Sequence, residues 1–65
     1  MIDVEIRTKS YSRFLEIRQW CIDQFGKTGN FVDDTWSGRE ALDFGYAMFY
    51  FQYEKDAMLF MLRWL

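Results

Sequence analysis

Three groups of residues in this chain have types and spacing that could support chemistry, and the first is a run that resembles part of a phosphate-binding loop. The run Gly26-Lys27-Thr28 has the ending of that loop, but Cys21 stands where its first glycine belongs. The run also follows a predicted helix, whereas a phosphate-binding loop follows a strand. We therefore interpret Gly26 as the end of the helix and expect no nucleotide site here.

Four acids form the second group. They are Asp33, Asp34, Glu40 and Asp43. Gathered together, such carboxylates could hold a metal ion or form an acid–base pair. The alternative is that they are solvated residues of an edge strand and a connecting segment, and we favour that interpretation. We expect no metal site and no cofactor.

Cys21, the third candidate, is the single cysteine of a chain that contains no histidine. A thiol nucleophile needs a base to activate it, and the usual zinc sites combine several cysteines and histidines. Cys21 also falls on the apolar stripe of a predicted helix, so we interpret it as a buried structural thiol. Because no nucleophile can be paired with a base, we predict that the protein is not an enzyme and has no small-molecule substrate.

Length and composition favour one small domain, residues 1–65, with an aromatic core. The chain is 51% hydrophobic and contains seven Phe, four Tyr and three Trp. Its net charge of −2 comes from acids and bases spread without runs, which provides no general attraction for nucleic acid or anionic lipid. No apolar run is long enough to span a bilayer, and the N-terminus lacks the pattern of a secretion signal. We expect a cytoplasmic protein that does not associate with membranes.

The first half of the chain predicts a strand followed by a helix. Apolar and polar residues alternate over Ile2 to Thr8, which indicates a strand with one buried face. Apolar residues then recur at steps of three and four, which indicates an amphipathic helix. Either Ser10 or Ser12 can cap this helix, and Gly26 ends it in the left-handed position.

The second half predicts two strands and a helix. Phe31 to Trp36 reads as a weaker strand because it contains two aspartates. Gly38 to Asp43 is either a short helical turn or the loop of a hairpin. Tyr46 to Gln52 is rich in rings and predicts the third strand, and Glu54 to Leu65 predicts the second helix.

These elements predict an α+β fold, a truncated ferredoxin-like β-α-β-β-α arrangement with a three-stranded sheet and two helices on one face. We expect the first strand to run parallel to the third, with the second strand antiparallel to the third on its far side. The outer edge of the first strand, near Asp3, Glu5 and Arg7, is then unpaired. An open edge is either protected by charge or pairs with another chain, so these three residues are candidate partner contacts.

The third predicted strand carries a second candidate contact surface. Alternation places Tyr46, Met48 and Tyr50 on the face without helices. The other strand residues, expected to point at the helices, are Ala47, Phe49 and Phe51. An exposed patch of rings and thioether favours protein contact. The alternative is that the segment 37–45 folds across this patch and covers it.

The last predicted helix is apolar nearly all round and ends in Arg63-Trp64-Leu65. Such a helix is usually buried on more than one side. Two short helices and three strands offer too little cover for it. We therefore add Trp64 to the candidate partner contacts and expect a homodimer or another protein to supply the missing cover.

Part of the chain resembles the RNA-recognition motif. Gly45-Tyr46-Ala47, Phe51 and Asp56-Ala57 are similar to the third strand and second-helix start of that family. The resemblance implies a ferredoxin-like fold and binding of single-stranded RNA on the helix-free face. Asp3 and Glu5 stand where that family has an aromatic platform, and acids repel phosphates, so nucleic acid is not the partner we expect.

A longer pattern resembles a group of very small, uncharacterised proteins encoded by tailed bacteriophages. It comprises Trp20-Cys21, Phe25-Gly26, Phe49-x-Phe51 and Glu54-x-Asp56-Ala57-x-x-Phe60-x-x-Arg63-Trp64. The resemblance implies a phage origin and a role in the cytoplasm of an infected bacterium, with no established activity. Our main hypothesis is a non-enzymatic homodimer that binds and modulates a host or phage protein. The alternatives are a virion or self-assembling component and a single-stranded RNA binder.

Overall fold

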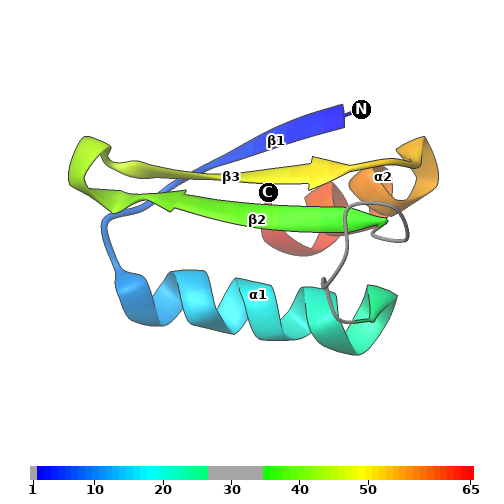
Figure 1. Cartoon of the computed structure of the whole chain (residues 1–65), viewed down its shortest axis with the longest axis horizontal. Helices are drawn as coiled ribbons and strands as arrows, with labels where there is room; N and C mark the ends of the chain where they lie inside the picture. The colour runs from blue at the N-terminus through cyan, green and yellow to red at the C-terminus, as the bar shows by residue number, and fades with distance from the viewer. Residues whose placement is uncertain (1, 27–34) are drawn as a thin grey trace.

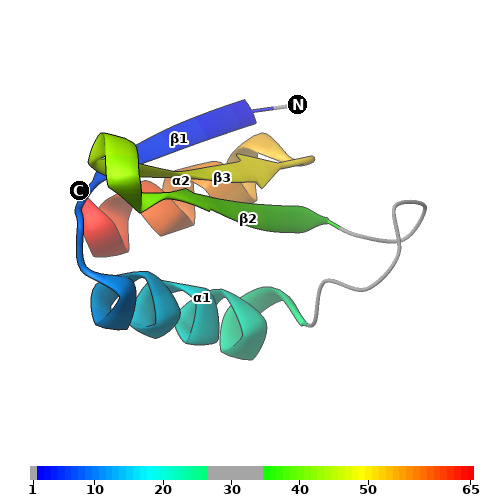
Figure 2. The same cartoon turned by 60° about the vertical axis from the view of Figure 1, so that its left-hand side comes forward.

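The computed structural model describes residues 2–26 and 35–65. The elements in these ranges are β1 (Ile2–Arg7), α1 (Tyr11–Phe25), β2 (Trp36–Ala41), the 3-10 helix η1 (Leu42–Phe44), β3 (Tyr46–Phe51) and α2 (Glu54–Trp64). The strands form one sheet in the order β1-β3-β2, and both helices lie on the same side of it (Figure 1). Figure 2 shows the same two layers from another side. The chain therefore has an α+β fold whose β-α-β-β-α order corresponds to the first five elements of a ferredoxin-like fold.

The sheet is antiparallel throughout, because β3 runs opposite to both of its neighbours. Ile2 of β1 and Trp36 of β2 both lie opposite Phe51 of β3. The expectation that the first strand runs parallel to the third was wrong, although the predicted strand order was right. The crossover through α1 makes β2 parallel to β1, and the η1 turn then reverses the chain so that β3 enters between them.

The second strand lies further along the chain than predicted. β2 begins at Trp36, so the predicted strand over Phe31 to Trp36 shares only its last residue with it, and residues 31–34 lie outside the described ranges. The segment 38–43, predicted as a helical turn or a loop, is strand as far as Ala41. Only η1 has helical geometry. Pairing with β3 decides this region, because strand propensity is overridden by cross-strand packing.

Local capping sets the boundaries of α1. The Ser10 hydroxyl accepts a hydrogen bond from the Arg13 N–H at 3.2 Å, so Ser10 is the cap rather than Ser12. Gly26 ends the helix, and its N–H donates to the Ile22 carbonyl at 2.9 Å. Its φ of 92° is positive as expected, but its ψ of 171° is extended, so the predicted left-handed helical conformation was wrong. Glycine adopts such backbone angles without steric cost.

The core between the sheet and the helices consists largely of rings. The largest fully buried side chains are Phe49, Phe51, Phe60, Ile17 and Cys21. The Phe60 centroid lies 5.0 Å from the centroids of both Phe49 and Phe51. Together with fully buried Ala47, this confirms which face of β3 points at the helices. No helix in the described ranges is long and apolar enough to cross a membrane.

Candidate functional site

The side of the sheet opposite the helices, which we call the open face, carries most of the candidate contact residues. The strand register places three cross-strand rows there: Asp3, Tyr50 and Ser37; Glu5, Met48 and Arg39; and Arg7, Tyr46 and Ala41. Both described helices lie on the other side (Figure 2). The structure thus brings six of the seven residues predicted from the sequence onto one surface, contributed by β1 and β3.

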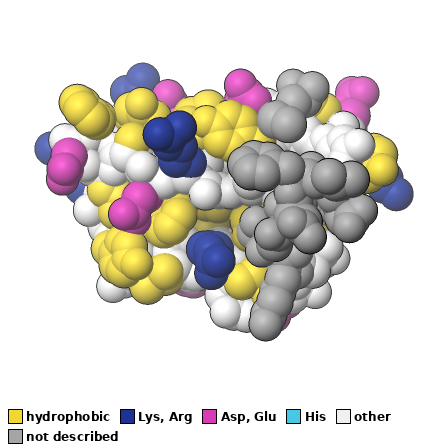
Figure 3. Space-filling model, viewed as in Figure 1, with side chains coloured by type: hydrophobic (Ala, Val, Ile, Leu, Met, Phe, Trp, Pro, Cys, Tyr) yellow, Lys and Arg dark blue, Asp and Glu magenta, His cyan; other side chains and the backbone are white. Residues whose placement is uncertain are grey.

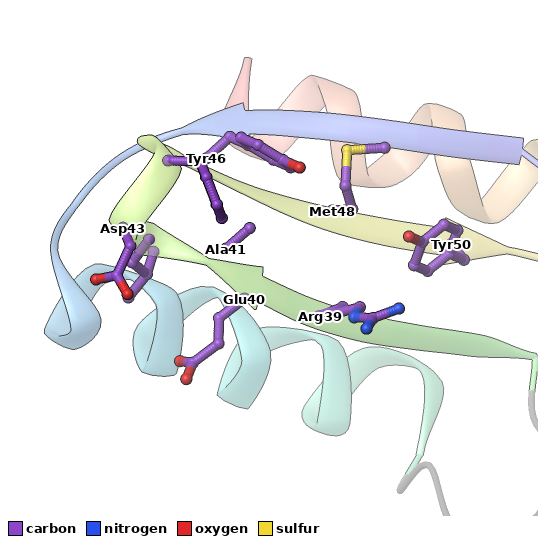
Figure 4. Close-up of a pocket in the computed structure, with 9 residues that line it drawn as sticks. Arg39, Glu40, Ala41, Asp43, Tyr46, Met48 and Tyr50 are labelled. Atoms are coloured by element: carbon purple, nitrogen blue, oxygen red, sulfur yellow. The ribbon is translucent and has the colours of Figure 1, made fainter.

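The open face has an apolar centre flanked by charged side chains. Its central lane, from β3, consists of half-buried Tyr46, Met48 and Tyr50. On the β1 side, Arg7 Nε lies 3.3 Å from Glu5 Oε2, and both side chains are exposed. An exposed pair of this kind contributes only about 0–1 kcal/mol to stability. On the β2 side, Arg39 is exposed (Figure 4).

A hollow lies at one end of the open face, where β2, η1 and β3 meet. Its lining comprises residues 39–44 together with Tyr46, Met48 and Tyr50. Tyr46 and Met48 rise from β3 on the open face, whereas Glu40 extends toward α1 on the other side of the sheet (Figure 4). The hollow therefore extends from the apolar lane of β3 to the η1 turn.

The alternative that the segment 37–45 folds across the open face was wrong. Residues 37–41 belong to β2 and lie beside β3 in the sheet. Leu42 packs against the core, and Phe44 is 82% exposed at the rim of the hollow. The apolar lane therefore keeps its access to solvent at this end.

Trp64, the seventh candidate, lies in the helical layer and not on the open face. Its ring meets Trp20 edge to face with centroids 6.1 Å apart. The guanidinium carbons of Arg63 and Arg13 lie 4.0 Å and 5.7 Å from its centroid. Its Nε1 is buried without a hydrogen-bond partner among the described residues. Trp64 thus links α2 to α1, while the large apolar side chains that α2 exposes are Met58, Leu59 and Leu62.

Sequence reasoning missed the third lane of the open face, which is Ser37, Arg39 and Ala41 on β2. These residues were placed in a turn or loop because the predicted strand ended at Trp36. The alternation is too weak to signal a strand, since Glu40 on the helix side is exposed just as Arg39 on the open face is. Gly38 inside that alternation argues against a strand on propensity alone.

The other chemical candidates from the sequence do not assemble into a site in the described ranges. Glu40 and Asp43 lie on β2 and η1, and no group of three or more His, Cys, Asp or Glu residues there could hold a metal ion. Asp33 and Asp34 lie outside those ranges, as do Lys27 and Thr28 of the loop-like run. Gly26 ends α1, as interpreted.

Cys21 is fully buried on α1, which confirms the interpretation of a buried thiol. Desolvation by burial raises the pKa of the Cys21 thiol from 9.0 to about 12. The thiol, which is the less nucleophilic form, therefore persists through neutral pH. This environment suits a packing residue and not a nucleophile.

The buried thiol is expected to make stability fall at alkaline pH. The folded state holds the Cys21 proton more tightly than the unfolded chain, so this contribution is complete below pH 9.0 and is lost as pH rises toward about 12. Between these values the free energy of unfolding should drop by about 1.4 kcal/mol per pH unit. Urea denaturation at about pH 8 and about pH 10.5 measures the drop. Cys21→Ala is the control, and equal pH slopes in the two proteins would contradict the prediction.

The arrangement of the open face suits contact with another macromolecule better than chemistry on a small one. It has rings and a thioether in the middle, charges of both signs at the sides and a hollow that opens to solvent. Charges of both signs also mix with hydrophobic side chains on the side seen in Figure 3. In comparisons with known proteins, no family model, no curated protein and no solved structure matches this chain.

Proposed function

We propose that the protein is a non-enzymatic binding protein whose open face contacts another protein chain. The observation that carries this proposal is the convergence of three apolar side chains, Tyr46, Met48 and Tyr50, between lanes of charge. Protein interfaces share this anatomy, with a centre enriched in Tyr and Met and a polar rim. Given the resemblance to small phage proteins, the proposed partner is a host or phage protein whose activity the contact modulates.

The charges of the open face favour a protein over an RNA strand. Asp3 lies opposite Tyr50 and Glu5 lies opposite Met48, so two acids border the surface on which bases would stack. Phosphates passing beside them would be repelled. On the β1 side, Arg7 is close enough to Glu5 to pair with it. On the β2 side, Arg39 is the cation.

Site-specific photo-crosslinking tests the proposal. A photoreactive amino acid at Met48, on the open face, is expected to form a covalent adduct with a protein in bacterial extract. The same amino acid at Glu16, an exposed position of α1, is the matched control. We expect a protein adduct from position 48 and none from position 16, because Met48 lies in the apolar centre of the open face between charged lanes, whereas Glu16 lies on the exposed side of α1.

Two outcomes would contradict the proposal. Equal adducts from positions 48 and 16 would indicate non-specific encounter. An adduct from position 48 that nuclease removes would assign the open face to RNA instead. An adduct with a second copy of the chain or with a different protein supports the proposal.

A further inference from the structure

We infer that the open face of one copy packs on the open face of a second copy, about a two-fold axis parallel to the strands, so that Arg39 of each copy meets Glu5 of the other. The inference rests on the proposed function and assigns a second copy of this chain, in place of a host protein, as the occupant of the same surface. It is carried by the positions of the apolar lane and of the charges across the sheet.

The apolar lane lies on the midline of the open face because β3 is the central strand. Rotation about an axis parallel to β3 places the apolar lane of the second copy directly over that of the first. Tyr46, Met48 and Tyr50 then each face their own counterparts in the second copy. Such a contact uses the same patch twice, as two-fold interfaces do, and both rings and thioethers suit self-contact.

The two charged lanes are complementary under the same rotation. An axis parallel to the strands lays β1 of one copy over β2 of the other. In the middle row, which contains Glu5, Met48 and Arg39, each Glu5 then meets an Arg39. In the outer rows, Asp3 meets Ser37 and Arg7 meets Ala41. No two like charges oppose each other.

The other face-to-face arrangement is disfavoured by charge. An axis across the strands lays β1 over β1 and β2 over β2. The middle row then places Glu5 against Glu5 and Arg39 against Arg39, on either side of Met48, and these two like-charge contacts offset the two Asp3–Arg7 contacts that the outer rows would form. Opposed like charges destabilise a contact and fix its orientation against the alternative. Aligned packing of two sheets permits both arrangements, so the charges make the choice.

The hollow beside η1 agrees with the same axis. A rotation about the strand direction keeps the η1 turns of both copies at one end of the dimer. Phe44, which lines the hollow and is 82% exposed, then lies at the same end of the dimer in both copies.

Charge reversal and mixing test the axis directly. In a dimer of the Arg39→Glu variant, Glu5 of each copy faces an acid at position 39 of the other. In a dimer of the Glu5→Arg variant, Arg39 of each copy faces an arginine at position 5 of the other. Each should raise the dimer dissociation constant at least about tenfold, measured by light scattering on dilution. An equimolar mixture of the two variants restores both opposite-charge contacts in a heterodimer, so it should dimerise as the wild type does.

The controls reverse exposed charges elsewhere. Arg18→Glu and Glu16→Arg on α1 should leave the dissociation constant unchanged, and circular dichroism of every variant should match the wild type. A wild type that is monomeric on dilution from high concentration overturns the inference, whereas a crosslink from Met48 to a different protein would still support the proposed function. A wild-type dimer whose single variants do not weaken, or whose mixture does not recover, also overturns the proposed axis.

Discussion

Replacing Phe60 by alanine is expected to lower the free energy of unfolding by about 3–5 kcal/mol. Phe60 is fully buried, with its centroid 5.0 Å from those of Phe49 and Phe51 and 6.2 Å from that of Trp20. Removing the ring leaves a cavity between sheet and helix that these large neighbours cannot fill. Because a domain of this size has about 5 kcal/mol of stability or less, the variant should be largely unfolded in water.

Leu62→Ala is the matched control for this change. Leu62 lies on the same helix but is 84% exposed, so its truncation should change stability by no more than about 0.5 kcal/mol. Both substitutions introduce alanine into α2, so the gain in helix propensity acts in the same direction in each. Urea denaturation followed by circular dichroism compares them. Similar losses in the two variants would show that α2 is not packed on the sheet through Phe60.

Replacing Gly38 by alanine is expected to destabilise the protein by about 1–3 kcal/mol, by overpacking the core. A Cβ at this position would lie 2.9 Å from Cε1 and 3.1 Å from Cδ1 of Phe49. That ring cannot retreat, since it is fully buried between Phe14 and Phe60. The expected sign is unusual, because alanine is ordinarily about 0.5–1 kcal/mol better than glycine inside a strand.

A double-mutant cycle with Phe49→Leu identifies the cause. The smaller side chain removes the ring atoms that the new methyl group meets, so Gly38→Ala should cost at least about 1 kcal/mol less in the Phe49→Leu background. Ser37→Ala, on the open face of the same strand, is the control and should be close to neutral. If Gly38→Ala stabilises the protein, or if the two changes are additive, close contact with Phe49 is not the reason for glycine here.

The elements with clear periodicity could be predicted from the sequence. β1, α1, β3 and α2 lie within about a residue of their predicted ranges, because alternation and three- or four-residue spacing report which side of an element is buried. β2 could not be predicted, since Gly38 occupies the position where β2 approaches the Phe49 ring and has no side chain to signal it. The direction of β1 was wrong because the crossover through α1 was taken to relate β1 to β3, whereas it relates β1 to β2.

The candidate site was predicted in part for the same physical reasons. Alternation along β3 placed Tyr46, Met48 and Tyr50 on the helix-free face, where the structure has them. Arg39 was missed together with its strand. Trp64 could not be distinguished from Leu62, because on a helix that is apolar nearly all round, spacing alone does not mark the buried side.

The central position of β3 also determines the order in which the sheet can assemble. β2 and β3 are joined by the short η1 turn, so their pairing closes a small loop. β1 must instead reach β3 from far along the chain, since Ile2 lies opposite Phe51. Closing the longer loop carries the larger entropic penalty, and pairings between distant segments form slowly. We therefore expect the hairpin of β2 and β3 to form first and β1 to be the last strand to join the sheet.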